Sequence, residues 1–120
     1  MRGKKPRPNP GTPIDPATMP APETLDPVAR SEWDRLVGEL APAGTITPRD
    51  RTVLTLHCAA VSRWQHSQRQ IDQTGGQVVR SPAGCPIVNP WVSIARRAFD
   101  EVMRTASELG LSPVAQARLA

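Results

Sequence analysis

The sequence has no tyrosine and a single phenylalanine, and aromatic residues make up only 3% of its 120 positions. Apolar residues of all kinds reach 38%, and most of them are Leu, Val, Ala and Ile. A chain of this size can form one compact domain around a small aliphatic core. We therefore expect the core to need support from oligomerisation.

Long apolar runs are also missing, and none would serve as a signal peptide or a membrane span. Cysteine is scarce, since the chain contains only Cys58 and Cys85. One disulfide between them is conceivable, but without a secretion signal the sequence favours free thiols. A reducing compartment, the cytoplasm, is the expected location.

Catalytic signatures are absent as well. The sequence contains no GxxxxGK(S/T) phosphate loop, no GxGxxG, no HExxH, no GxSxG and no paired CxxC. A zinc site at His57 and Cys58 is disfavoured, because adjacent residues on a helix point about 100° apart. We expect a packed Cys58, solvated histidines, no metal, no cofactor and no enzymatic activity.

Proline and arginine, by contrast, are plentiful. Eight of the 14 prolines lie in the first 27 residues, which predicts that residues 1–25 form a disordered, extended arm outside any packed core. The remainder, residues 26–120, is expected to be one helical domain. The arm is basic at its start through four residues: Arg2, Lys4, Lys5 and Arg7.

Three polar residues suited to N-capping, Asp26, Thr47 and Asn89, each precede a proline, the residue favoured at the first helical position. Asp50 completes an approximate capping box with Thr47. Gly110 is placed to end the third helix. Apolar residues recur at helical spacing between these signals. The helices are expected at residues 27–41, 47–74 and 90–109, with a short last helix at 114–119.

Between the second and third helices, residues 77–80 and 86–88 flank a turn at 81–84 and suggest a short two-stranded hairpin. The predicted fold class is all-α, with three main helices and this hairpin between the second and the third. The second helix turns polar after Trp64, so its second half is expected to project beyond the core.

The chain carries a formal net charge of +4, and 13 of its 15 basic residues are arginine, whose planar fork suits phosphate. Arg49 and Arg51 lie in the first turn of the second helix, where the helix dipole disfavours cations. Free amides beside two guanidinium groups would bind a DNA phosphate. The alternative is an acidic neighbour, on another subunit or on the first helix: Glu32, Asp34 or Glu39.

Other arginines differ in their acidic neighbours. Arg63 has none three or four positions away and is a further candidate, whereas Arg69 has Asp72. On the third helix, three arginines each have an acid four residues later, which predicts solvated pairs rather than phosphate contacts. The candidate DNA-binding residues are Arg2, Lys4, Lys5, Arg7, Arg49, Arg51 and Arg63.

A series of short motifs resembles the small terminase subunits of tailed phages over almost the whole chain. The motifs are, in order, Asn9-Pro10-Gly11, Glu32-Trp33, Ile46-Thr47, a glycine-bounded hairpin, Asn89-Pro90 and residues 108–113, ELGLSP. The resemblance implies a ring-shaped homo-oligomer that binds double-stranded viral DNA near the packaging start in the host cytoplasm. It also implies recruitment or stimulation of the large terminase subunit, which holds the ATPase and nuclease.

Two other readings remain open at this point. The first is an adaptor that binds only protein, through its arm and helical surface, and salt-dependent DNA binding would separate it from a packaging subunit. The second is a small enzyme, which hydrolysis of ATP or DNA by the purified chain would reveal. The sequence also leaves open whether the first two helices form a helix-turn-helix.

Overall fold

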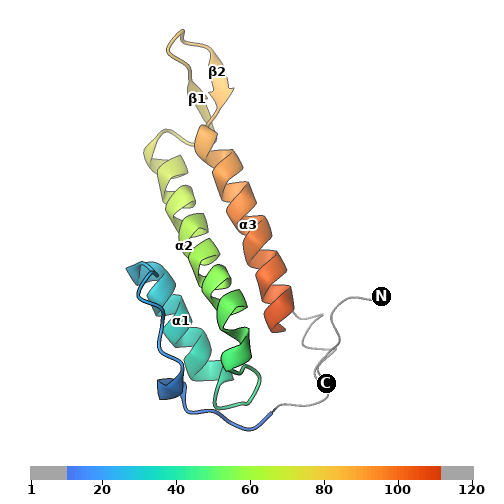
Figure 1. Cartoon of the computed structure of the whole chain (residues 1–120). Coiled ribbons are helices and arrows are strands. Elements are labelled where there is room, and N and C mark those ends of the chain that lie inside the picture. Colours follow the sequence, from blue (N-terminus) through green and yellow to red (C-terminus); the bar gives the residue numbers. More distant parts are fainter. Residues whose placement is uncertain (1–10, 112–120) are drawn as a thin grey trace, which may run out of the picture.

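The computed structural model of the chain describes residues 11–111 and shows an elongated molecule (Figure 1). The helices are α1 (Pro27–Leu40), α2 (Arg51–Gln73) and α3 (Pro90–Leu109), with the short 3-10 helices η1 (Pro16–Thr18) and η2 (Pro48–Asp50). α3 packs antiparallel along α2, and α1 packs against the first half of α2. Strands β1 (Val78–Arg80) and β2 (Pro86–Val88) form a hairpin at the far end of α2 and α3.

The N-caps predicted from the sequence, Asp26, Thr47 and Asn89, each begin a helix in the structure. The Asp26 carboxylate accepts from the amide of Ala29 at 2.8 Å, and Asn89 Oδ1 accepts from the amide of Trp91 at 3.0 Å. Thr47 and Asp50 form the expected capping box, although its turn is the separate 3-10 helix η2 and α2 begins only after it. Gly110 ends α3 with a φ of 76°, the left-handed conformation that glycine adopts without strain.

The core lies between α1, the first half of α2 and the segment that precedes α1. Trp33 is fully buried, and its Nε1 donates to the carbonyl of Met19 at 2.8 Å. Met19 and Leu25 are buried in the same cluster. The expectation that residues 1–25 stay outside any packed core is therefore wrong for the part of 11–25 that includes Met19 and Leu25, because these side chains pack with Trp33 in one cluster.

The two strands form an antiparallel sheet in which Val78 pairs with Val88 and Val79 with Ile87. The hairpin was expected, but it means that the fold is mainly helical rather than strictly all-α. The expected last helix, at 114–119, falls outside the described residues.

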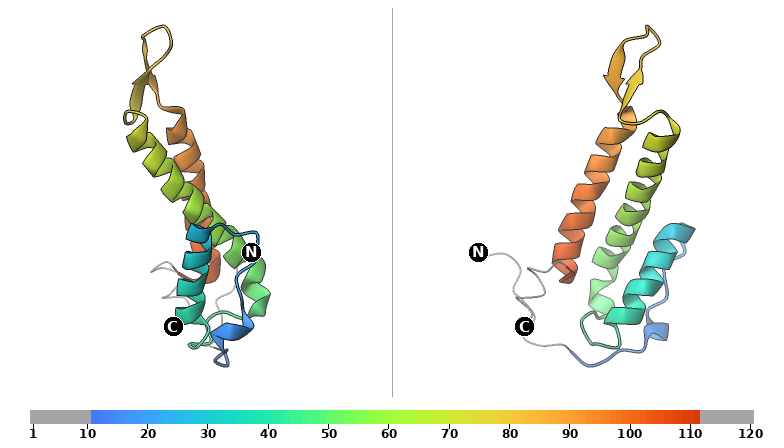
Figure 2. Two further views of the ribbon diagram at one scale, coloured as in Figure 1. Left: turned by 90° about the vertical axis from the view of Figure 1, so that its left-hand side faces the viewer. Right: turned by 180° about the vertical axis from the view of Figure 1, so that it is seen from behind.

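The second half of α2 does extend past α1, but α3 covers it along its length (Figure 2). As predicted, this half lies beyond the core cluster around Trp33, but Ser67 and Ile71 are buried there, so it is not surrounded by solvent. Most polar residues of the second half of α2, among them Gln65, His66 and Arg69, are exposed. No helix in the part of the chain that the structure describes combines the length and the apolar character needed to cross a bilayer.

Several side-chain contacts join the helices, and two of them are hydrogen bonds of buried side chains. His57 Nδ1 lies 2.8 Å from Thr105 Oγ1 of α3, and Ser62 Oγ donates to the Asp26 carboxylate at 2.7 and 2.9 Å. His57 is 4% exposed, which corrects the expectation that both histidines are solvated. His66 is exposed and meets the ring of Trp91 edge to face. Cys58 is a buried free thiol and Cys85 an exposed one.

Candidate nucleic-acid interface

Arg49 and Arg51 both lie exposed at the beginning of α2. Neither forms an ion pair with another residue of 11–111. The acidic neighbours on α1 do not reach them, because Glu32 and Glu39 contact Arg35 instead, at 2.6 and 3.6 Å. Within the described chain, the pairing that competed with phosphate binding is therefore absent.

The amides of this turn are not free, contrary to the anion site expected from the sequence. The amide of Arg49 donates to Thr47 Oγ1 at 3.3 Å and that of Asp50 to the carbonyl of Thr47 at 2.9 Å. The amide of Arg51 donates to the carbonyl of Pro48. A phosphate here would meet the two guanidinium groups rather than bare backbone amides.

The chain segment that carries the basic arm joins the molecule at this same end. Gly11 donates its amide to the carbonyl of Gly44 at 2.7 Å, in the loop between α1 and η2. Ile14 is held next to it, since its amide donates to the carbonyl of Ala41 at 2.8 Å. The four basic residues of the arm lie outside the described residues, but they are only four to nine positions before Gly11.

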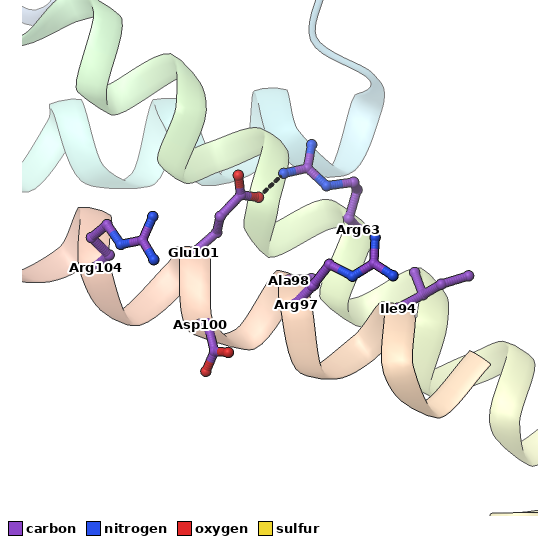
Figure 3. Close-up of a pocket in the computed structure, with 7 residues that line it drawn as sticks. All are labelled: Arg63, Ile94, Arg97, Ala98, Asp100, Glu101 and Arg104. Carbon is purple, nitrogen blue, oxygen red and sulfur yellow. Dashed lines mark hydrogen bonds and ion pairs between the residues drawn. The ribbon is translucent and has the colours of Figure 1, made fainter. Parts of the chain in front are cut away.

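Arg63 has an acidic partner that its own helix does not supply. Its guanidinium pairs with Glu101 of α3, and both side chains are about half exposed. The pair lies in an open cleft of about 510 Å³ between α2 and α3 (Figure 3). The cleft is lined by Arg63, Ile94, Arg97, Ala98, Asp100, Glu101 and Arg104.

Arg97 and Arg104, which line the cleft, are not among the candidates that the sequence indicates. The spacing predicts a pair between each arginine of α3 and the acid four residues later, but none of these ion pairs forms in the described chain, and Arg69 does not pair with Asp72 either. Glu101 contacts Arg63 instead of Arg97. The antiparallel packing of α3 on α2 decides this, so only a prediction of that packing would have found it.

The two groups of arginines are separate on the surface. Arg51 and Arg63 are twelve residues apart on α2, which corresponds to a rise of about 18 Å and a rotation of about 120°. The described chain thus presents one basic group at the start of α2 and another in the cleft. It contains no group of three metal-binding side chains.

The family model for the phage terminase small subunit matches residues 29–120. The chain belongs to this family. No curated protein and no solved structure matches it significantly. Membership connects the chain to phage DNA packaging and to a subunit type that is generally non-catalytic.

The region of this small terminase subunit that matches the family contains α1 except for its first two residues, all of α2 and α3, the hairpin and both arginine groups. The basic arm precedes the match. Any contribution of Arg2, Lys4, Lys5 and Arg7 to DNA binding is therefore argued from their charge and from where Gly11 lies.

Proposed function

We propose that this small terminase subunit binds double-stranded viral DNA near the packaging start and recruits or stimulates the large terminase subunit. It does so as a ring-shaped homo-oligomer in the host cytoplasm, with several copies of a weak electrostatic site acting together. The sequence has no P-loop motif, so the ATPase of packaging would belong to the large subunit.

The observation that carries DNA binding is the exposure of Arg49 and Arg51 without an acidic partner in the described chain. Cations at the start of a helix are disfavoured by a few tenths of a kcal/mol, and a phosphate would reverse that penalty. Guanidinium groups bind phosphate oxygens in a bidentate way, which suits the DNA backbone. We assign these two residues to phosphate contacts rather than to base recognition.

The basic arm extends the same site. Arg7 is four residues before Gly11, so an extended chain keeps it within about 14 Å of that anchor. Gly11 lies against the loop that leads into η2. The arm and the start of α2 can therefore contact neighbouring phosphates of one duplex.

Self-association is supported by apolar side chains that the monomer leaves uncovered. None of these large residues lies on α1, and all of them lie on α2, α3 or the hairpin. Where exposed apolar residues gather, as Val78, Ile87 and Val88 do in the hairpin, they often mark an interaction surface. The large exposed apolar residues are Leu56, Val78, Ile87, Val88, Ile94, Phe99 and Met103.

The experiment compares DNA binding by wild type, Arg49→Ala/Arg51→Ala and the control Arg69→Ala/Arg96→Ala, which removes the same charge elsewhere. We expect the first variant to bind a duplex from the packaging region more weakly, and its plot of log affinity against log salt to flatten by up to about 1.8 for two lost contacts. The control is expected to bind much like wild type.

Two results would contradict the assignment of Arg49 and Arg51 to a DNA-binding site. Equal losses in both variants would mean that net charge alone attracts DNA. A lower free energy of unfolding only in Arg49→Ala/Arg51→Ala would mean that these arginines hold the helices together. If wild type assembles but does not bind DNA, the adaptor that binds only protein becomes the better reading.

A further inference from the structure

The β-hairpin stands on a fixed base. Asn89 is 2% exposed, and its Nδ2 donates to Thr74 Oγ1 at 2.7 Å and to the carbonyl of Gly76 at 2.8 Å. These bonds tie the end of α2 to the beginning of α3. The hairpin therefore extends from the helices in a set direction (Figure 1).

Both edges of the hairpin are open. In the described chain β1 and β2 pair only with each other. The bonds from Asn89 to Gln77 and from Ser81 to Cys85, both 2.8 Å, identify the pairs whose main-chain groups point inward. Because these pairs alternate along an antiparallel ladder, other positions turn their main-chain groups outward. They are Val78, Arg80, Pro86 and Val88.

The strands carry one feature that limits pairing with a further strand: Pro86 has no amide to donate from its outward position on β2, although its carbonyl can still accept. Val78 and Val88 face each other across the sheet and are 62% and 66% exposed. Ile87, at the next position and so on the opposite face, is 41% exposed. The one charged strand residue, Arg80, turns back and donates to the carbonyl of Gly84 at 2.7 Å. Edge strands of soluble proteins are commonly guarded by charged side chains or by proline, and β1 contains no proline.

We propose that the hairpin pairs edge to edge with the hairpin of a second copy, β2 of one subunit against β1 of the next. This pairing rests on the self-association proposed above and makes the hairpin edges the contact between neighbouring subunits. A rotation about an axis parallel to the strands places β2 beside the neighbour's β1 in antiparallel orientation, as within one hairpin. Repeated around a ring, this pairing leaves no open edge.

Other occupants leave part of the hairpin uncovered. A strand from a different protein would pair with one edge and leave the other open. Two hairpins related by a two-fold axis would likewise leave one edge open on each copy. Hairpins of two copies can approach one another without charge repulsion between their exposed strand residues Val78, Ile87 and Val88, because these three side chains are apolar.

The test removes one outward amide without touching the hairpin's own ladder. Val78→Pro has this effect, and Pro86 already occupies an outward position in the partner strand. The control Val78→Ala removes the side chain but keeps the amide. We expect Val78→Pro to need about tenfold more protein than Val78→Ala for half-assembly, as measured by light scattering. Circular dichroism should show equal helix content.

A second measurement uses the native thiols. Cys58 is buried, and burial raises its pKa to about 12, whereas Cys85 is exposed in the hairpin turn. Donor and acceptor dyes should therefore attach at Cys85. We expect energy transfer between mixed copies in wild type and its loss in Val78→Pro.

Each outcome decides one point. A monomeric wild type would overturn both self-association and the hairpin pairing. Equal assembly of Val78→Pro and Val78→Ala, or no energy transfer between assembled wild-type copies, would overturn only the pairing. Normal assembly of Val78→Pro with loss of binding to the large subunit would make a strand of that protein the occupant instead.

Discussion

At the scale of single residues, burial between α2 and α3 controls the protonation of His57. Desolvation lowers the pKa of this histidine below its ordinary value of 6.5, and the nearby Glu32 offsets only part of the effect. The folded protein therefore binds a proton less readily than the unfolded chain. The stability that depends on neutral His57 is complete above about pH 6.5 and is lost as the pH falls below it.

We predict that His57→Gln flattens this pH dependence. The free energy of unfolding, measured in urea between about pH 7.5 and about pH 5, should fall less in the variant than in wild type. His66→Gln is the matched control and should keep the wild-type slope, because His66 is exposed. Equal slopes in wild type and His57→Gln would show that another group titrates.

At the scale of elements, the carboxylate of Asp26 accepts hydrogen bonds from both α1 and α2. It caps α1 through the amide of Ala29 and accepts a hydrogen bond from Ser62 of α2. These bonds lower the pKa of Asp26 below its ordinary value of 3.8. One residue thus stabilises the start of α1 and fixes how α1 lies on α2.

We predict that Asp26→Ala lowers the free energy of unfolding by about 2 kcal/mol, through loss of the cap and of the bond from Ser62. Ser62→Ala should cost less, because it leaves the cap intact. Asp15→Ala removes a cap only from the three-residue helix η1 and should cost under about 0.5 kcal/mol. A similar loss from both aspartates would argue against the link between α1 and α2.

At the scale of the whole molecule, the basic group at the beginning of α2 and the apolar hairpin lie at opposite ends of an elongated shape. Arg49 and Arg51, which have no acidic partner among residues 11–111, and the anchor at Gly11 share the end that is opposite the hairpin. A ring built through the hairpins would leave the opposite end of every subunit open. Several weak basic sites would then face one duplex together.

We predict that deleting residues 2–7 weakens DNA binding uniformly across sequences. The slope of log affinity against log salt should flatten by up to about 0.9 for each lost phosphate contact. Assembly, measured by light scattering, should be unchanged. An unchanged slope would remove the arm from the site and leave Arg49 and Arg51 as its proposed members.

The sequence by itself determined the features that depend on residues a few positions apart. The caps at Asp26, Thr47 and Asn89, the stop at Gly110 and the hairpin turn could all be predicted, because each is a local contact. The terminase resemblance could be found in the same way, and the family match confirms it. Such signals need no knowledge of how helices pack.

Only the tertiary structure decided the contacts between distant residues. Trp33 donates a hydrogen bond to the carbonyl of Met19, fourteen positions away, and His57 forms a hydrogen bond with Thr105, forty-eight positions away. Arg63 pairs with Glu101, which leaves Arg97 without the partner that its own helix offered. Helical periodicity indicates which faces are apolar, but which faces meet depends on packing. The packing determines which arginines are left without an acidic partner among the described residues, and so which are available for the proposed DNA contacts.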